Sequence, residues 1–228
     1  MSVDELKKAA AEKAIEHVKS GMVLGLGSGS TAKYAVAKIG ELWQSGKLTD
    51  LVAIPTSEYT ANQAQGYGVP LTTLDQHPVI DLAIDGADEV DPQLNLIKGL
   101  GGALLREKMV ESCAQRFIII VDGSKPVKKL GTRGPLPVEV VQFNWKAQTR
   151  WLESLGCLPE LRGGEDHPFV TDNGNYIIHC TFPNGIDNPH TLGATLKNRT
   201  GVVEHGLFLN MATEVIVAVD DGLQFMKK

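Results

Sequence analysis

The chain of 228 residues is 43% hydrophobic and carries 22 lysines and arginines against 27 aspartates and glutamates, a net charge of −5. We expect an ordinary soluble globular protein, because this length can bury a sizeable core as one large or two modest domains. The sequence has no basic run and no apolar run near the roughly 20 residues of a membrane span. We therefore expect neither nucleic acid nor a membrane as a partner.

The start of the chain and the cysteines indicate the cellular compartment. The first residues are acidic and lysine-bearing and lack the apolar core of a signal peptide, so we expect a cytoplasmic protein. The three cysteines are far apart and form no CxxC pair. This pattern is typical of reduced, structural thiols.

The first predicted element is a helix that begins with a capping box. Ser2 and Glu5 have the spacing in which each side chain bonds the other residue's backbone amide. Apolar residues then recur at every fourth position until Gly21 ends the segment. Lys7 lies in the first turns, where a cation opposes the helix dipole, so it is either a solvated surface lysine or a residue that faces a ligand.

A strand, a glycine loop and a helix follow, which is an arrangement typical of phosphate sites. The strand at 22–24 leads into GLGSGST, residues 25–31, and apolar spacing predicts a helix over 32–43. Glycines permit the tight turn, and amides at a helix start can surround a phosphate together with nearby hydroxyls. The candidate residues are Ser28, Gly29, Ser30 and Thr31. The alternative is a tight connection without a ligand.

Two missing features narrow the kind of phosphate. The loop lacks the GK[ST] ending of a P-loop, which disfavours ATP. A dinucleotide fold needs an acidic residue about 20 positions on to bind a ribose. Here the next predicted strand, 51–54, ends in Pro55, Thr56 and Ser57, whose hydroxyls we expect to cap a helix over 58–65. A small phosphorylated metabolite therefore fits better than NAD or ATP.

An acidic stretch follows the next predicted strand. Residues 79–84 have the pattern of a short buried strand, and the chain breaks at Gly86 within a group of acids. These acids are Asp85, Asp88, Glu89 and Asp91. Ligands of open α/β sheets bind outside the C-terminal strand ends, so the stretch is a candidate site. A solvated, turn-rich loop is the alternative.

A glycine turn after Lys98 precedes the next predicted helix, 103–110, whose apolar residues 104, 105 and 109 suit one face. Backbone amides at such a helix start, with a lysine beside them, can hold an oxyanion. Glu107 lies about one turn into this helix, where the helix field favours the ionised carboxylate that a general base requires. Taken alone, Glu107 would instead be a surface glutamate, since most helix charges are solvated.

Further strands are expected around this stretch. A short strand is predicted near 69–74, and the fully apolar segment 117–121 has the character of a parallel strand. Lys125 follows that segment and therefore reaches the same sheet edge, either as an exposed loop residue or as a substrate contact. The segments 207–209 and 215–219 can rejoin this sheet.

A composition shift at 131–137, rich in glycine and proline, marks the start of a second unit. Its predicted elements are a strand over 138–142, an amphipathic helix over 145–155 and a hairpin over 169–182 with a tight Asn-Gly turn. A second helix over 188–198 and a further apolar segment over 201–203 follow. This order predicts a small α+β layer.

No residue pattern indicates a metal site or an activated serine. The six histidines show no HxH, HxxxH or HExxH spacing, and no GxSxG elbow is present. Spacing alone leaves Ser/His/Asp catalysis open. We expect no metal and no other cofactor.

Several motifs resemble one family in the same order and over nearly the whole chain. GLGSGST, DGADEVD and KGLGGALLREK, with the later GSK, PLPVEV and TDNG, closely resemble type A ribose-5-phosphate isomerases. Ser28 stands where many members carry threonine, and Leu100 interrupts an often unbroken glycine run. The segment from Cys180 to Pro189 matches the family pattern weakly, so no function is carried onto it.

The resemblance implies the interconversion of D-ribose 5-phosphate and D-ribulose 5-phosphate in the non-oxidative pentose phosphate pathway, without a metal. It implies a Rossmann-like α/β domain with a parallel sheet, which we place at 1–131 plus 207–228. A smaller ferredoxin-like α+β domain would occupy 132–206. The family also implies a homodimer, with a tetramer as the larger alternative.

The resemblance also assigns roles to residues. Glu107 is the base, while Lys98 and the amides of Gly99 to Gly101 stabilise the enediolate. Asp85 and Asp88 handle the sugar hydroxyls, and we favour Asp85 for opening the furanose ring. The other predicted substrate contacts are Lys7, Ser28, Gly29, Ser30, Thr31, Gly86, Ala87, Leu100 and Lys125.

The chemistry of the residues agrees with these roles. Moving a carbonyl between C1 and C2 requires taking a proton from C2 and returning one to C1, which a single carboxylate can do. A hydride shift generally needs a metal to polarise both oxygens, and the absence of metal-ligand spacings in the sequence argues against it.

Two other classes of protein remain as alternatives. A regulator that senses sugar phosphates can share such a fold and loop, but it should carry a DNA-binding helix-turn-helix, for which we see no room before Met22. A CoA transferase-like enzyme uses a glutamate as an acyl nucleophile near a glycine loop. Mass spectrometry would identify the latter by its glutamyl-CoA adduct.

Overall fold

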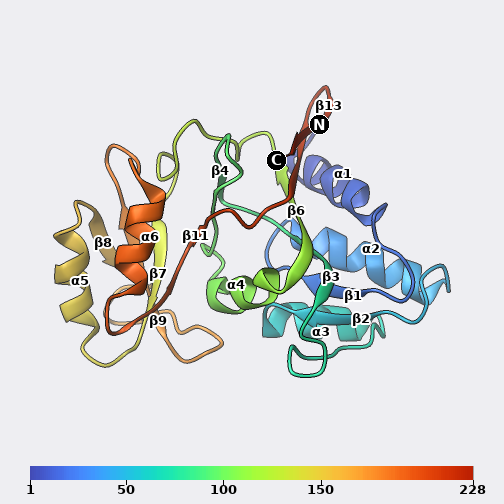
Figure 1. The fold of residues 1–228 in the computed structure, drawn as a ribbon, viewed down its shortest axis with the longest axis horizontal. Helices are drawn as coiled ribbons and strands as arrows, with labels where there is room; N and C mark the ends of the chain where they lie inside the picture. The colour runs from blue at the N-terminus through green and yellow to red at the C-terminus, as the bar shows by residue number, and fades with distance from the viewer. Residues whose placement is uncertain (228) are drawn as a thin grey trace. The chain divides into compact units, whose positions relative to one another are not determined.

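A computed structural model describes residues 1–227, which form two compact units (Figure 1). Unit 1 combines Met1–Ala87 and Arg106–Lys125 with the chain from Met211 onward. Unit 2 combines Asp88–Leu105 and Pro126–Asn210. Helices and strands carry the labels of Figure 1.

Unit 1 is built on a six-stranded sheet with the order β13-β12-β6-β3-β1-β2. All neighbouring strands are parallel except β12 and β13, which form an antiparallel pair. Without β13, the order is that of a doubly wound α/β fold, which confirms the predicted Rossmann-like class. The strands are β1 (Val23–Leu26), β2 (Val52–Pro55), β3 (Ile80–Asp85), β6 (Ala114–Asp122), β12 (Glu214–Val219) and β13 (Gly222–Lys227).

The helices of unit 1 follow the predicted pattern, except that the first helix ends at Ile15, before the predicted stop at Gly21. They are α1 (Val3–Ile15), α2 (Ala32–Gln44), α3 (Glu58–Gly66) and most of α4 (Leu104–Ser112). The predicted capping box is present, because Ser2 and Glu5 bond each other's backbone amides. Alanines on the buried face of α1 permit close packing against α2 and the sheet, and they belong to the main core of the unit.

The buried face of α4 differs from the prediction. Met109 was expected on the inner face but is 53% exposed, whereas Leu104 and Val110 are buried. Glu107 and Glu111 share the buried face with them, each less than 5% exposed. The apolar pattern was misleading here because the inner face of this helix carries two carboxylates.

The strand predicted near 69–74 is also wrong. Only Leu71 forms an isolated bridge, to Ala53 of β2. The Ala53 amide donates to Pro70 O and the Thr72 amide donates to Ala53 O, each at 2.9 Å. Pro70 has no amide hydrogen, which limits the pairing of this segment to those two bonds.

The second half of unit 2 has the βαββαβ order of a ferredoxin-like layer, as predicted. Its antiparallel sheet has the order β10-β7-β9-β8. The elements are β7 (Leu136–Val140), α5 (Trp145–Glu153), β8 (Leu158–Leu161), β9 (Tyr176–Thr181), α6 (Pro189–Lys197) and β10 (Val202–His205). Apolar side chains of these elements form the core of the unit.

The predicted hairpin over 169–182 is only half correct. Its second arm is β9, and Gly174 takes a positive φ in the expected turn. The first arm is reduced to one bridge between Val170 and Tyr176. Besides β7, β9 pairs antiparallel with β8, a strand that was not predicted because Pro159 interrupts its four residues.

A three-stranded sheet gives unit 2 different boundaries from those predicted. It has the order β11-β5-β4 and consists of β4 (Glu89–Val90), β5 (Leu96–Ile97) and β11 (Leu207–Phe208). The pairing assigns residues 88–105 to unit 2, although the predicted boundaries placed them in the first domain. The prediction that 207–209 rejoins the large sheet is wrong, whereas β12 confirms it for 215–219.

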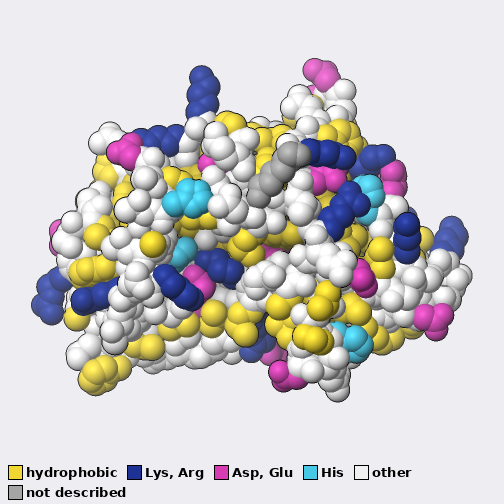
Figure 2. All heavy atoms as spheres, viewed as in Figure 1, with side chains coloured by type: hydrophobic (Ala, Val, Ile, Leu, Met, Phe, Trp, Pro, Cys, Tyr) yellow, Lys and Arg dark blue, Asp and Glu magenta, His cyan; other side chains and the backbone are white. Residues whose placement is uncertain are grey.

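Charged side chains of both signs are mixed on the surface. Figure 2 shows basic and acidic side chains interspersed over the visible face. In the part of the chain that the structure describes, no helix has both the length and the apolar content needed to cross a membrane. Cys113, Cys157 and Cys180 are free thiols.

Glu214 links three strands of the large sheet. At the start of β12, it accepts a hydrogen bond from Arg116 of β6 at 2.6 Å and lies 3.2 Å from the Lys227 ammonium of β13. Burial raises the pKa of Glu214, but hydrogen bonds and charges from Arg116 and Lys227 outweigh it and leave the pKa below its ordinary value. A lowered folded pKa stabilises the protein above the unfolded pKa, and this contribution disappears as the pH falls through the folded pKa.

We expect Glu214→Gln to lower the free energy of unfolding at pH 7 by about 1–3 kcal/mol, the range for hydrogen bonds to charged groups. The difference from wild type should shrink below pH 4.5, the ordinary pKa of the carboxyl. Urea unfolding between pH 7 and pH 3 measures both effects. The control is Glu41→Gln, which breaks an exposed ion pair with Lys38 and should change stability by less than about 1 kcal/mol. A pH-independent loss in Glu214→Gln would contradict this assignment.

Candidate functional site

The C-terminal ends of neighbouring strands gather the predicted site residues of unit 1. β1 leads into the loop Gly27–Thr31, and its neighbour β3 ends at Asp85. The order of a doubly wound sheet reverses between these two strands, which is where such sheets bind ligands. β6, the next strand along, leads to Lys125 at the same edge.

Asp85 joins the glycine loop to β3. Its Oδ1 accepts hydrogen bonds from the backbone amides of Ser28, at 3.0 Å, and Gly86, at 2.7 Å. A Cβ atom on Gly27 would overlap with the Asp85 carboxylate. The first glycine of the loop is therefore required by the close approach of a buried carboxylate, and this part of the loop is fixed by Asp85.

A cluster of hydroxyls supports the loop from the other side. The Ser28 hydroxyl lies 2.7 Å from Thr56 Oγ1, 2.6 Å from Ser57 Oγ and 3.0 Å from Thr60 Oγ1. As predicted, Ser57 caps α3, because it accepts a hydrogen bond from the Thr60 amide. Their second role, as partners of Ser28, was not predicted, although three hydroxyl residues within five positions after a strand end are a usable signal.

Positive charge collects beside the same loop. Lys7 Nζ donates to Ser30 Oγ at 3.0 Å, so Lys7 faces the loop. Burial raises the pKa of Asp122 at the end of β6, but the hydrogen bonds from Ser124 and the charges of Lys125 and Lys7 hold it below its usual range. Both lysines therefore add positive charge to the surroundings of Asp122.

Thr31 marks the start of α2 at this loop. It is the N-cap residue, and among residues 1–227 its side chain makes no capping hydrogen bond. The amides in the first turn of a helix can instead be satisfied by an anion, which the helix dipole also favours. The loop, the helix start and the two lysines together suit a phosphate group.

Glu107 is a buried carboxylate in the first turn of α4. Its exposed fraction is only 4%, so the alternative of a solvated surface glutamate is wrong. The preceding residue, Arg106, is partly exposed and donates to Glu58 at 2.7 Å. A carboxylate shielded from water is well suited to removing a proton from carbon, because little solvent has to be displaced from it.

Lys98 is a buried cation in unit 2, with an exposed fraction of 2%. Its backbone amide donates to Gly206 O at 2.9 Å, and its ammonium lies 5.3 Å from the ring centroid of Phe208. A Cβ atom on Gly206 would overlap with the Lys98 carbonyl. Gly206 therefore lets two chain segments approach closely and fixes the position of the lysine.

The glycine turn after Lys98 is bonded to Asp88. The Leu100 amide donates to Asp88 Oδ2 at 3.0 Å, and the Gly102 amide donates to Gly99 O at 2.9 Å. Gly99 and Gly102 both have positive φ, at +106° and +96°, which glycine adopts readily. The turn is thus a defined structure in which one amide already binds a carboxylate.

The predicted site residues are divided between the two units. Unit 1 holds Lys7, Ser28, Gly29, Ser30, Thr31, Asp85, Gly86, Ala87, Glu107 and Lys125. Unit 2 holds Asp88, Lys98, Gly99, Leu100 and Gly101. Only Gly86 and Ala87 separate Asp85 from Asp88 along the chain.

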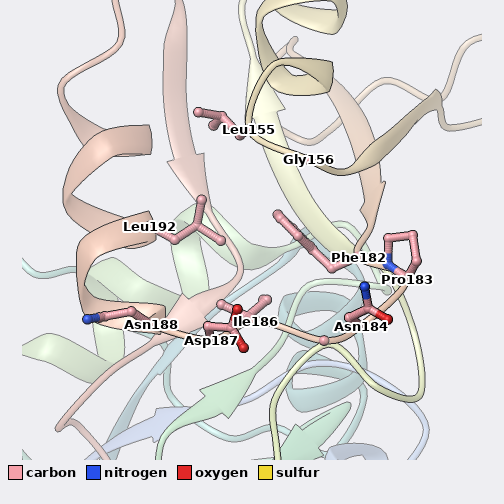
Figure 3. Close-up of a pocket in the computed structure, with 10 residues that line it drawn as sticks. Leu155, Gly156, Phe182, Pro183, Asn184, Ile186, Asp187, Asn188 and Leu192 are labelled. Atoms are coloured by element: carbon pink, nitrogen blue, oxygen red, sulfur yellow. The ribbon is translucent and has the colours of Figure 1, made fainter.

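Unit 2 also contains a pocket that the predicted site residues do not line. Its volume is about 300 Å³, and Figure 3 shows it between the end of α5 and the start of α6. The lining residues are Leu155, Gly156, Phe182, Pro183, Asn184, Gly185, Ile186, Asp187, Asn188 and Leu192. Much of the lining comes from the segment onto which no family function was carried.

Within residues 1–227, no three histidine, cysteine, aspartate or glutamate side chains lie together as a group that could hold a metal ion.

The fold and these residues are typical of α/β proteins that bind a small phosphorylated ligand. A doubly wound sheet presents a phosphate-type loop, flanking lysines and buried carboxylates that suit a small phosphorylated ligand. The chain belongs to the family described as ribose 5-phosphate isomerase A (phosphoriboisomerase A), whose profile matches residues 52–222.

Similar sequences and structures cover essentially the whole chain. A probable chloroplastic ribose-5-phosphate isomerase 3 of Arabidopsis thaliana is 54% identical, over 100% of this chain and 85% of its own length. Ribose-5-phosphate isomerase A of Synechococcus sp. (strain JA-3-3Ab) is 52% identical over 100% of this chain and 99% of its own.

Two solved structures agree with these matches. A D-ribose-5-phosphate isomerase in complex with phospho-erythronic acid has a TM-score of 0.97 and 43% identity, over 100% of both chains. Ribose 5-phosphate isomerase from Plasmodium falciparum has a TM-score of 0.95 and 43% identity, over 99% of both chains. Full-length matches to isomerases favour an enzyme of this family over a regulator or a CoA transferase-like protein.

We expect Gly27→Ala to reduce kcat/KM for ribose 5-phosphate by about 100-fold or more, because the added methyl would displace Asp85 or the loop. A steady-state assay of ribulose 5-phosphate formation measures the change. Gly66→Ala, at the end of α3, is the matched control, since a Cβ there meets no atom within 4 Å. Wild-type kinetics in a folded Gly27→Ala protein would show that the loop tolerates the displacement.

Proposed function

We propose that this chain interconverts D-ribose 5-phosphate and D-ribulose 5-phosphate by proton transfer through an enediolate, with Glu107 as the base. Membership of the ribose 5-phosphate isomerase A family supports the overall reaction. The observation that carries the mechanism is the burial of Glu107 in the first turn of α4, after the glycine turn. The helix dipole favours the ionised carboxylate there.

The proposed reaction proceeds in two proton transfers. Starting from open-chain ribose 5-phosphate, the Glu107 carboxylate takes the proton from C2, and the C–H electron pair forms a double bond between C1 and C2. The negative charge moves onto the C1 oxygen, which gives the enediolate. A proton then shifts between the two oxygens, and Glu107 returns a proton to C1 as the carbonyl forms at C2. No electrons leave the sugar.

Stabilisation of the enediolate is assigned to Lys98 and the amides of Gly99 to Gly101. A buried ammonium and fixed N–H donors act strongly on a developing negative charge, because they need little reorganisation. Burial of Lys98 and the defined geometry of the turn support this role. The Leu100 amide binds Asp88 in the structure, so its share in holding the anion would require exchange of that bond.

A ligand of a relative supports the same assignment. Phospho-erythronic acid, named in the complex of the related isomerase, carries a phosphate and a planar carboxylate on a four-carbon chain. A carboxylate has two oxygens that share one negative charge, as an enediolate does. Such a compound is therefore a reasonable mimic of the intermediate, and affinity for it is a useful probe of enediolate binding.

The phosphate and the sugar hydroxyls are assigned to the remaining predicted residues. Contacts between Lys7 and Ser30, and the charge of Lys125 near Asp122, support a phosphate site at the 28–31 loop. Asp85 and Asp88 would bind sugar hydroxyls, with Asp85 opening the furanose ring. Binding of the non-reacting phosphate would anchor the sugar so that C1 and C2 are presented to the base.

We also propose a homodimer in the cytoplasm, with a tetramer as the alternative. The family resemblance supports the assembly, and exposed apolar side chains in unit 2 such as Phe143, 81% exposed, would be covered by a partner copy. Light scattering of the purified protein, whose protomer mass is 24.6 kDa, distinguishes these states from a monomer.

We expect Glu107→Gln to lower kcat by about 100-fold to 10,000-fold, the usual contribution of a general base, while phospho-erythronic acid still binds within a fewfold of its wild-type affinity. Steady-state assays measure kcat, and isothermal titration calorimetry measures the affinity for phospho-erythronic acid. Glu111→Gln removes the other buried carboxylate of α4 and serves as the matched control, with a much smaller effect on kcat. Full activity in Glu107→Gln would remove this residue from the mechanism.

Isomerisation in heavy water should place solvent deuterium at C1 of ribulose 5-phosphate, since a proton held on a carboxylate exchanges with solvent. Proton NMR of the product, taken at several stages of slow turnover, measures the incorporation. A hydride shift would instead carry the C2 hydrogen to C1 in every molecule. Complete retention with no solvent deuterium would therefore overturn the enediolate route.

A further inference from the structure

Two stacked side chains, Arg162 and Phe169, pack against the glycine turn of unit 2. The central carbon of the Arg162 guanidinium lies 3.6 Å from the centroid of the Phe169 ring. The Phe169 amide donates to Arg162 O at 2.8 Å, so the backbone closes the loop between them. The Arg162 amide in turn donates to Ile177 O at 2.9 Å, which ties the pair to β9. Neither side chain has a role in the site described above.

The pair meets the turn at Gly102. A Cβ atom on this glycine would lie 2.6 Å from two ring carbons of Phe169 and 2.7 Å from Arg162 Nη1. These distances are shorter than real Cβ contacts, so the stack presses directly against the glycine backbone. Gly102 is buried, has a φ of +96° and closes the turn by its hydrogen bond to Gly99. The stack therefore supports the end of the turn that follows Lys98.

The turn has a second neighbour, at Leu100. A Cβ atom on Gly134 would lie 3.7 Å from Leu100 Cδ1, which places the 131–134 segment beside the turn. Buried Glu89 fixes that segment, because its carboxylate accepts the amides of Gly131, Arg133 and Gly134 at 2.6–3.1 Å. The 131–134 segment is thus fixed by hydrogen bonds where it meets Leu100, and the Arg162 and Phe169 stack supports the turn at Gly102.

Placing a charged side chain at this position costs free energy, because part of the guanidinium is removed from water. Nη1 is buried and makes no hydrogen bond within residues 1–227. Burial lowers the pKa of Arg162, but a guanidinium remains protonated. Burial and the Arg162 charge also lower the pKa of His179 on β9. An apolar side chain would pack here without leaving a buried donor unsatisfied, so packing alone does not account for an arginine.

We propose that Arg162 is a positioning residue for isomerisation: stacked on Phe169, it fixes the glycine turn after Lys98 and adds a partly buried positive charge beside that turn. The inference rests on the proposed function, in which Lys98 and the turn amides stabilise the enediolate. Negative charge at C1 and C2 develops only on the way to that intermediate. The guanidinium should therefore favour the intermediate over the bound sugar, which affects kcat more than KM.

The test compares folded variants by kcat, KM and affinity for phospho-erythronic acid. We expect Arg162→Met, which keeps length but removes the charge and the planar group, to lower kcat by about 10-fold to 100-fold. KM for ribose 5-phosphate should change by less than about threefold, while the affinity for phospho-erythronic acid falls in parallel with kcat. Arg162→Lys, which restores only the charge, should recover part of both losses.

A matched control separates this role from general stacking. Arg199 of unit 2 also lies over an aromatic ring, 4.9 Å from the Trp151 centroid. Arg199→Met should lower the melting temperature without changing kcat or the affinity for phospho-erythronic acid. An Arg162→Met protein that behaves like this control, with a stability loss only, would overturn the proposal, and so would wild-type behaviour.

A second variant and the wild-type protein cover the remaining outcomes. If Arg162→Met does not fold, Phe169→Leu replaces it, because this variant removes the ring but keeps the charge. A selective loss of kcat in Phe169→Leu supports the proposal, and an unchanged kcat overturns it. The wild-type protein is assayed in parallel. No isomerisation by wild type would reject the proposed function itself, whereas an active wild type with unaffected variants rejects only the role of Arg162.

Discussion

The bonding of Asp85 to the glycine loop is the constraint on which the unit 1 part of the site depends. One carboxylate oxygen accepts two backbone amides, and the carboxylate lies so close to Gly27 that no side chain fits there. This contact joins the ends of two neighbouring parallel strands. It therefore sets the path of the loop up to Ser28. The Ser28 hydroxyl then bonds Thr56 and Ser57, which follow β2.

Burial of charged groups is the common feature of both units. Asp85, Lys98 and Glu107 are each less than 5% exposed, although charged side chains are rarely buried without partners. Removing such groups from water costs stability, and that cost is tolerated where fixed charges have to act on a substrate. The same reasoning applies to the two carboxylates on the inner face of α4, where an ordinary helix would place apolar residues.

Much of the fold was predictable because it depends on local pattern. The capping box of α1, the apolar run of β6 and the strand–loop–helix at Gly27–Thr31 all appear where periodicity and turn residues place them. The candidate residues at the sheet edge could be named because parallel strands end together. The structure also places the Lys7 ammonium against Ser30 of the glycine loop, while its contact with a ligand stays a prediction.

The rest depends on pairing between distant segments, which local pattern does not report. β8 is short and contains Pro159, so its pairing with β9 gives little sequence signal. The pairing of β11 with β5 changes the unit boundaries, and the stack of Arg162 on Phe169 meets a glycine 60 positions earlier in the chain. The buried face of α4 was predicted incorrectly because it carries two carboxylates, and a pattern of apolar residues cannot indicate buried carboxylates.

The order in which the chain builds its large sheet has a consequence for synthesis on the ribosome. β12 lies between β6 and β13, yet it follows β6 by some ninety residues that belong mainly to unit 2. Until β12 emerges, the apolar strand β6 presents an open edge to other nascent chains. Pairing across such a long separation is slow, so this interval is the period of greatest exposure to aggregation and the point at which chaperones have the most to protect.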